Sequence, residues 1–312
     1  NSNRTPRTYN AAMHQVTQWG TFFYTRIKML KSPATYDEQI SKLKEHGCLI
    51  SDEKRVREIL SGISYFRISA YFLPFRKSNK SYVSGTTFER VYRLYEFDRE
   101  MRRLLFSAVE TIEVALRAKL SYYYAHKYGA AGYMDESNFN PKHNHRRFIS
   151  MIDQSKKENS RLLFVKHYQT KYMGEFPLWV IMELFTMGML SRFYSDMLTK
   201  DKKLFTSAVY GENYKDIESW LRCCTDLRNI CAHYGRLYYR IFSAIPAGMK
   251  EVDENAERRL FAAILVVKKL YPDKAKWSSE IFIQLHAIMD EYRDAISLKH
   301  VGFPENWEEI LA

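Results

Sequence analysis

The sequence predicts an all-α fold, and three observations favour this class over a β-rich one. Only 12 of the 312 residues are Gly and 8 are Pro, which leaves little material for the tight turns between many strands. Apolar residues recur at steps of three, four or seven along much of the chain, as on one face of a helix. Several of these segments begin at a Ser, Thr or Asn that can cap a helix.

An N-terminal arm and a first capped helix are expected before residue 50. Residues 1–34 are polar and poorly periodic, so they are predicted to form an arm outside the core. Thr35 stands three positions before Glu38, which is the spacing of a capping box. A helix should therefore begin after Thr35, and Gly47 is suited to end it.

Three further helices are expected in the next part of the chain. Ser51 can cap the first. The aromatic run 63–75 fits a strand or a short buried helix, and the helix is preferred because a lone strand would leave its edges unpaired. Thr86 and Glu89 repeat the capping-box spacing. They precede one long amphipathic helix, or two in series, with an apolar face of Val91, Leu94, Met101, Leu105, Val109, Ile112, Leu116 and Leu120.

Helices also dominate the expected second half of the chain. Residues 127–147 have the composition of a basic loop, and helices are predicted at about 145–157 and 160–172. Pro177 suits the first residue of a helix that would run to about residue 199.

The remaining helices are predicted from their caps and periodicity. Asn213 can open a helix that Gly235 is placed to end. Two more amphipathic segments, at about 254–271 and 279–297, complete the expected layout.

The charge balance favours an anionic partner. Against 36 Asp and Glu stand 48 Lys and Arg, and the formal net charge of +12 attracts phosphate backbones or anionic membrane surfaces. No window approaches 18 uncharged apolar residues and the first 20 residues lack a hydrophobic signal core. No membrane partner is therefore expected, and the protein is expected to be cytoplasmic.

The cysteines fit a reducing compartment, because Cys48, Cys223, Cys224 and Cys231 are too few and too bunched for a disulfide framework. The last three could join His233 in a zinc site. Their spacing matches no standard ligand pattern, so no metal and no cofactor are expected.

The stretch "DLRNICAHYGRLYYR" at 226–240 concentrates the residues best suited to chemistry, among them Arg228, Asn229 and His233. On an ideal helical wheel Arg228 falls inside an apolar stripe, and a guanidinium there needs an anionic or hydrogen-bonding partner. The stripe contains Ile217, Leu221, Cys224 and Cys231.

Three acids are candidates for that partner: Glu110, Glu113 and Glu183. An ordinary surface pair between Glu113 and Arg117, one helical turn apart, fits the same letters. From spacing alone Arg228 could be only a paired interior charge, with His233 interacting with the helix C-terminus. Residue types leave these alternatives open.

Four ordered stretches resemble the Abi-like proteins of bacterial abortive-infection systems, the AbiD and AbiF group. They cover about residues 36–240, and the most specific is "RNICAHYGRLYYR", which matches Arg-Asn-x-x-x-His followed by Gly-Arg and an aromatic tail. Tyr234 departs from the pattern, since the family often has a second histidine there. The other three are "YDEQISKLKEHGCLI" with "ISYFRISAYFLPF", "YEFDREMRRLLFSAVETIEVALRAKL" and "FPLWVIMELFTMGMLSRFY".

This family is similar to the HEPN superfamily of all-α ribonucleases, in which Arg and His form the catalytic pair of a metal-independent RNA cleavage. The resemblance implies catalytic roles for Arg228 and His233, with Asn229 as a supporting polar residue. It also implies a homodimer in which two motifs face each other. The residues that would hold phosphates and stack on bases are Arg236, Arg240, Tyr238 and Tyr239.

The resemblance also suggests a division of the chain after the arm. A single all-α Abi-like HEPN domain is expected at 35–312, as a HEPN-type helical bundle with additional N- and C-terminal helices. Its parts would be an N-terminal subregion at 35–85, a core at about 86–240 and C-terminal helices at 250–312.

One basic stretch outside the motif is a further candidate for RNA contact. "KHNHRRF" at 142–148 has the letters of an HNH nuclease without its spacing, so it is interpreted as a solvated basic loop whose Arg146 and Arg147 could touch RNA.

The expected function is a toxin or effector ribonuclease of phage defence that cleaves RNA by attack of its 2′-hydroxyl. The alternative is a catalytically silent RNA-binding or scaffold protein that holds a small non-coding RNA. RNA is the expected partner in both.

Overall fold

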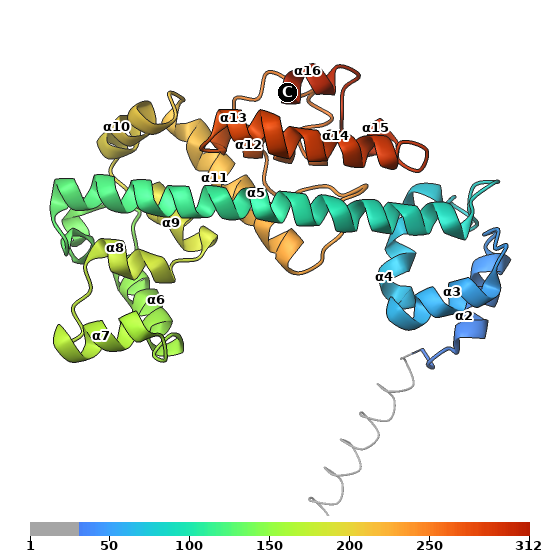
Figure 1. The fold of residues 1–312 in the computed structure, drawn as a ribbon, viewed down its shortest axis with the longest axis horizontal. Helices are drawn as coiled ribbons and strands as arrows, with labels where there is room; N and C mark the ends of the chain where they lie inside the picture. Colours follow the sequence, from blue (N-terminus) through green and yellow to red (C-terminus); the bar gives the residue numbers. More distant parts are fainter. Residues whose placement is uncertain (1–30) are drawn as a thin grey trace, which may run out of the picture.

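The computed structural model describes residues 31–312, and every regular element in that range is helical (Figure 1). Strand-like pairing there is limited to isolated bridges, such as the one between Leu49 and Thr87. The all-α prediction is confirmed, while the assignment to a HEPN-type bundle and the boundaries of its parts stay predictions. Residues 1–30 of the expected arm lie outside the described residues.

Helix α5, Phe88–Tyr128, is the axis of the molecule and runs along almost its whole length in Figure 1. Its 41 residues span about 60 Å at 1.5 Å per residue. It is one continuous helix, rather than two in series. The N-cap is Thr87, one residue later than expected, because the Thr86 hydroxyl is buried and donates to the Val83 carbonyl instead.

The N-terminal helices gather at one end of α5 (Figure 1). Thr35 and Glu38 form the expected capping box at the start of α2, and Gly47 follows the helix with a φ of +88°. The expected cap at Ser51 is wrong, since Asp52 accepts from the Arg55 amide. The helices here are α2 (Tyr36–Glu45), α3 (Glu53–Gly62), α4 (Tyr65–Ser69) and η1 (Ala70–Phe75), so the preference for helix over strand at 63–75 is confirmed.

At the other end of α5 the single helix expected at 177–199 is wrong. Pro177 caps the segment with an extended ψ of 152°, and Thr186 starts a new helix by accepting from the Met189 amide. A further helix, α10, was not expected. The elements are α6 (His145–Glu158), α7 (Leu163–Lys171), α8 (Leu178–Ile181), η4 (Met182–Leu184), α9 (Met187–Asp196) and α10 (Thr199–Val209), with short turns η2 (Gly132–Met134) and η3 (Glu136–Asn138) before them.

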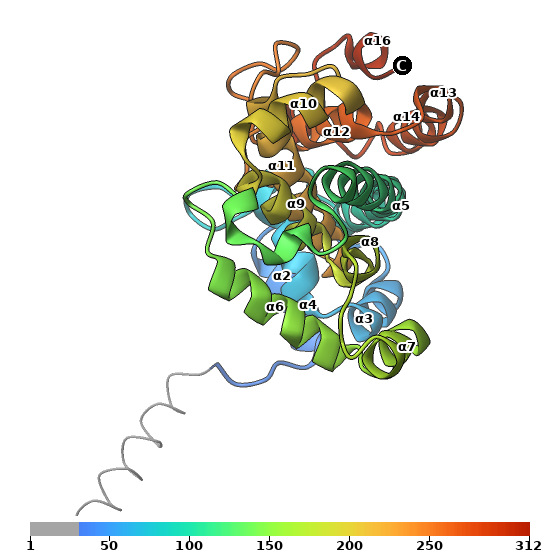
Figure 2. The same ribbon diagram turned by 90° about the vertical axis from the view of Figure 1, so that its left-hand side faces the viewer.

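Helices α11, α12 and α14 pack along the middle of α5. Figure 2, which looks along α5, shows α8, α9, α11, α12 and α14 arranged around it. The C-terminal helices begin and end at other residues than expected, because 254–259 form turns and 292–297 leave the helix. They are α11 (Tyr214–Ala232), α12 (Leu260–Leu270), α13 (Lys274–Lys276), η5 (Trp277–Ile281), α14 (Phe282–Glu291), α15 (Leu298–Val301) and α16 (Trp307–Leu311).

The core follows the apolar face of α5, whose predicted residues are all buried. Between residues 31 and 312 no helix is long and apolar enough to cross a membrane.

Candidate active site

The motif stretch occupies the last turns of α11, which packs against α5, α9 and α12. Asn213 caps the helix as expected, by accepting from the Lys215 amide. The expected core position of Arg228 is wrong: Leu227 is fully buried, while the Arg228 side chain is 32% exposed. Arg228 therefore lies at the edge of the apolar stripe, not inside it.

Helix α11 ends in a Schellman turn that leaves His233 exposed as the C-cap residue. The Gly235 amide donates to the Ile230 carbonyl at 2.7 Å, and the Tyr234 amide donates to Cys231 at 3.1 Å. Tyr234, not glycine, takes the left-handed position, with a φ of 56°. Gly235 is needed for another reason, because a Cβ there would lie 2.9 Å from Ile230 Cγ2.

Arg228 is held against α5 by an acid and a ring. Its Nε lies 3.8 Å from Glu113 Oε2, and its guanidinium lies 5.9 Å from the centre of the Phe106 ring. Glu113 also accepts from Arg117 at 3.1 Å, so the ordinary helical pair and the contact with Arg228 are both present.

The other two candidate acids do not contact Arg228. Glu183 Oε2 lies 3.9 Å from Arg117, and that arginine also donates to the Phe185 carbonyl at 2.9 Å. Glu110 is exposed, and its side chain makes no hydrogen bond or ion pair within residues 31–312. Of the three acids, Glu113 is the one positioned to orient Arg228.

The three motif side chains do not meet within one chain. His233 lines a cavity of about 920 Å³, whereas Asn229 lines a separate depression of about 520 Å³ beside Ser243. The link between them is a backbone hydrogen bond of 3.0 Å, donated by the His233 amide to the Asn229 carbonyl. One chain therefore does not bring the side chains of Arg228, Asn229 and His233 together at one reacting phosphate.

A buried acid that sequence reasoning missed fixes the loop after the motif. Asp98 of α5 accepts from the backbone amides of Leu237 at 2.6 Å and Tyr238 at 2.8 Å, and from the Tyr71 hydroxyl at 2.8 Å. Arg102 lies 3.7 Å from the same carboxylate and donates to the Gly235 carbonyl at 3.1 Å.

Burial raises the pKa of Asp98 to about 6, against the lowering effect of the Leu237 amide and of Arg102. The signal for this pair was present in the sequence. Asp98 and Arg102 are four residues apart, and Asp98 interrupts the apolar stripe between Leu94 and Leu105.

The predicted RNA-contacting residues after the motif differ in their surroundings. Tyr238 is only 1% exposed, and its hydroxyl accepts from the Ser297 amide and lies 2.8 Å from His300 Nδ1, so it has no free face for a base. Tyr239 is half-buried, with the Arg259 guanidinium 5.5 Å from its ring centre. The expected stacking role of Tyr238 is thus incompatible with this packing.

The two arginines of the same stretch are partly buried. Arg236 donates to the Ala70 carbonyl at 2.9 Å, and burial lowers the pKa of its guanidinium. Arg240 lies 6.0 Å from the centre of the Phe242 ring and donates weakly to the Arg236 carbonyl at 3.4 Å. Both side chains help to hold the loop in place.

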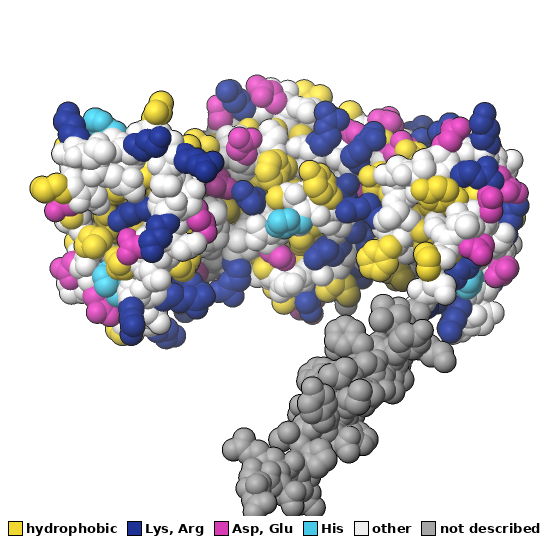
Figure 3. All heavy atoms as spheres, turned by 90° about the horizontal axis from the view of Figure 1, so that it is seen from below, with side chains coloured by type: hydrophobic (Ala, Val, Ile, Leu, Met, Phe, Trp, Pro, Cys, Tyr) yellow, Lys and Arg dark blue, Asp and Glu magenta, His cyan; other side chains and the backbone are white. Residues whose placement is uncertain are grey.

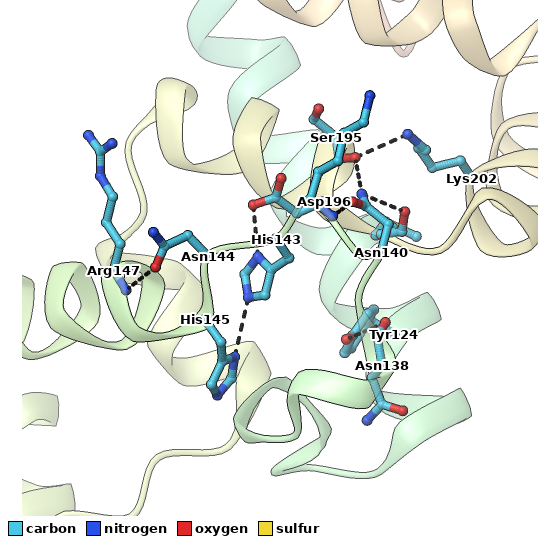
Figure 4. Close-up of polar contacts among 12 residues, drawn as sticks. Tyr124, Asn138, Asn140, His143, Asn144, His145, Arg147, Ser195, Asp196 and Lys202 are labelled. Atoms are coloured by element: carbon cyan, nitrogen blue, oxygen red, sulfur yellow. Dashed lines mark hydrogen bonds and ion pairs between the residues drawn. The ribbon is translucent and has the colours of Figure 1, made fainter.

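The basic stretch 142–148 is not a solvated loop throughout. His143 is buried, with Nδ1 2.9 Å from Asp196 and Nε2 3.2 Å from His145 Nδ1, as Figure 4 shows. The His143 ring stacks on the Phe139 ring, with 4.1 Å between the two ring centres. These contacts anchor the start of α6 in the core.

Arg146 and Arg147 remain exposed and line an open depression of about 800 Å³ on α6. This depression shares no lining residue with the cavity at His233. The two predicted RNA-contacting regions are therefore separate surfaces.

The cysteines suggested as zinc ligands are buried in α11. Burial raises the pKa of Cys223 and of Cys231 to about 12. The described part of the chain contains no group of three or more His, Cys, Asp or Glu side chains that could hold a metal ion.

Comparison with known proteins gives one family. A family model described as Abi-like protein matches residues 58–239, more than half of the chain, and the match includes the whole of α11. No curated protein and no solved structure matches.

Proposed function

The chain belongs to the Abi-like protein family, a membership that suggests a role in abortive infection, the bacterial defence against phage, and on that premise we propose that it is a metal-independent endoribonuclease. The proposed reaction is attack of an RNA 2′-hydroxyl on the neighbouring phosphate. The observation that carries the proposal is the end of α11, where a partly exposed Arg228, anchored by Glu113, is followed by an exposed His233.

The residue types suit the three tasks of this reaction. A proton must leave the 2′-oxygen, another must reach the departing 5′-oxygen, and the extra negative charge on phosphorus must be stabilised. Histidine titrates near neutrality and can perform either proton transfer. The guanidinium of Arg228 stays charged and can bind two phosphate oxygens, which suits the third task.

Glu113 acts in this proposal as a positioning residue for Arg228. With Oε1 on Arg117 and Oε2 facing Arg228, it keeps one side of the guanidinium occupied and leaves the rest for phosphate. Asn229 is exposed on the next position of α11 and supports the site as a polar group.

A homodimer gives the reaction its second histidine. One chain supplies a single motif histidine, and the side chains of Arg228 and His233 point to different places within it. Large apolar side chains stand exposed near the motif, namely Phe106 and Ile241. A second copy that covers them would bring two motifs face to face, with one His233 as base and the other as acid.

An RNA-binding scaffold without catalysis is the alternative function, and one experiment separates the two. Purified protein is incubated with RNA in EDTA, and the products are examined for new ends. Cleavage that leaves 2′,3′-cyclic phosphate and is lost in His233→Ala supports the ribonuclease. Stable binding with intact RNA supports the scaffold.

A further inference from the structure

The cavity beside His233 lies between the N-terminal helices and the end of α11. Its volume of about 920 Å³ is in the range of small-ligand pockets. One wall comes from α2, α4 and η1, and the opposite wall from His233, Tyr234, Gly235 and Arg236. Two segments about 165 residues apart in sequence thus form one concave surface.

The charge of this cavity has one sign. Its lining contains no Asp or Glu, while six of its residues are Lys or Arg: Lys31, Lys42, Arg67, Arg76, Lys80 and Arg236. None of the six forms an ion pair with a carboxylate of the described chain. In the view of Figure 3, Lys and Arg side chains are spread over the whole underside with Asp and Glu side chains among them, so the absence of acids is particular to the lining of the cavity. Such a surface attracts a polyanion.

Two of the arginines are fixed by bonds that cross between the walls. Arg67 of α4 donates to the Tyr234 carbonyl at 2.6 Å, and Arg236 donates to the Ala70 carbonyl at 2.9 Å. Each guanidinium has five N–H donors, so most of them stay available for a ligand. The two charges are therefore held in position before any ligand arrives, which reduces the entropy lost on binding.

Aromatic rings stand exposed among these charges. Phe66 is 88% exposed and Tyr234 is 68% exposed, and both line the cavity. Tyr234 adopts a left-handed backbone conformation that costs a non-glycine residue about 1 kcal/mol. Exposed rings beside unpaired cations are the combination that binds single-stranded nucleic acid, through phosphates on the cations and bases on the rings.

We propose that this cavity binds a few nucleotides of single-stranded RNA and leads the strand past His233. The phosphates contact Arg67, Arg76 and Lys42, and bases stack on Phe66 and Tyr234. The choice of RNA as the strand rests on the proposed ribonuclease function, whereas the binding of a single-stranded polyanion rests on the cavity alone.

The test measures binding of a fluorescent single-stranded RNA of about ten nucleotides with 2′-O-methyl groups, which the protein cannot cleave by the proposed reaction. Lys42, Arg76 and Lys80 are exposed, and their side chains make no hydrogen bond with the described chain, so their replacement by Gln leaves the fold intact. The Lys42→Gln/Arg76→Gln/Lys80→Gln protein should bind at least about tenfold more weakly at low salt. The slope of log Kd against log salt concentration should be smaller than that of wild type by up to about 2.

A matched control carries the same loss of charge elsewhere. Lys54, Lys166 and Lys200 are also exposed and unpaired in the described chain, and they lie outside the cavity. Their replacement by Gln should leave the salt slope unchanged. Equal slopes for the two triple variants would overturn the proposal, because binding would then depend on net charge and not on the cavity.

The stacking part is tested at Phe66. Phe66→Leu keeps an apolar side chain but removes the ring, and about a tenfold weaker binding is expected, with recovery in Phe66→Tyr. Leu163→Ala, at a similarly exposed apolar position, serves as control. Unchanged binding by Phe66→Leu would contradict stacking.

Competition separates a strand from a small anion. At constant ionic strength, millimolar inorganic phosphate should not displace the RNA, because it offers no base and a single phosphate. Full displacement would overturn the proposal in favour of a small-anion site. If wild-type protein never cleaves RNA but the cavity variants still weaken binding, the ribonuclease fails and the cavity stands. If wild-type protein cleaves RNA but the cavity variants bind RNA as tightly as wild type, the ribonuclease stands and the cavity proposal fails.

Discussion

Asp98 and Leu237 are joined by a hydrogen bond of 2.6 Å, in which the backbone amide of Leu237 donates to a fully buried carboxylate 139 residues earlier in the chain. The same carboxylate accepts from the next amide and from the Tyr71 hydroxyl, and it lies near Arg102. This contact ties the loop after His233 to α5. The orientation of the candidate active site therefore depends on an acid that takes no part in the proposed chemistry.

Asp98→Ala should destabilise the fold strongly. It leaves two amides and the Tyr71 hydroxyl without their acceptor and Arg102 without its acid, and breaking such a buried pair costs about 3–5 kcal/mol. Urea unfolding measures the loss. Asp290→Ala, which removes an exposed acid paired with Arg293, should change stability by less than about 1 kcal/mol. A similar small change in both variants would show that Asp98 does not hold the loop.

The Asp98 contact should also make stability depend on pH. The pKa of Asp98 is raised to about 6 in the fold from 3.8, so the folded protein holds this proton more firmly than the unfolded chain. The stability linked to Asp98 is fully present below about pH 4 and is lost as the pH rises through about 6. The free energy of unfolding of wild type minus that of Asp98→Asn should fall across this window and then level off. A flat difference would contradict the raised pKa.

The long helix offers a paired test of Arg228 positioning. Glu113→Gln removes the charge that faces Arg228, and a slightly misplaced guanidinium should lower RNA cleavage by about 10- to 100-fold. Glu110→Gln alters an exposed acid on the same helix whose side chain makes no hydrogen bond or ion pair within residues 31–312, and the activity of this variant should equal that of wild type. Equal activities of the two variants would exclude Glu113 as a positioning residue.

Tyr234→Gly should separate stability from binding. Glycine adopts a φ of 56° without strain, so the variant should gain up to about 1 kcal/mol of stability while it loses RNA affinity. Met173 has a φ of 52° and is 90% exposed away from the cavity, and Met173→Gly should show the gain in stability without the loss of binding. RNA affinity that falls equally in both variants would contradict the role of Tyr234.

Local sequence signals predicted much of the fold. The capping box at Thr35 and the cap at Asn213 could be predicted from the sequence, because a cap and its helix are neighbours in sequence. The long α5 followed from its apolar steps. The break at Thr186 inside the expected helix 177–199 could not be predicted from the sequence, because apolar residues continue on both sides of it.

The candidate site was predicted only in part. Its motif residues are local in sequence, but the partners that orient them lie on α5 more than one hundred residues away. Glu113 was one of three acids that sequence could not rank. Asp98 interrupts the apolar stripe, yet its partners, the amides of Leu237 and Tyr238, come close to it only in the folded chain. The burial of Tyr238 likewise depends on packing between distant segments, which local sequence does not show.

Metal-independent cleavage through His233 is tested by the chemistry of the RNA ends that wild type and His233→Ala produce in the presence of EDTA. A positioned acid or base contributes about 10²- to 10⁴-fold in rate. Wild type should leave 2′,3′-cyclic phosphate ends in chelator, and His233→Ala should cleave at least about a hundredfold more slowly with its thermal unfolding unchanged. Cleavage abolished by EDTA, 5′-phosphate ends, or undiminished cleavage by His233→Ala would exclude this mechanism.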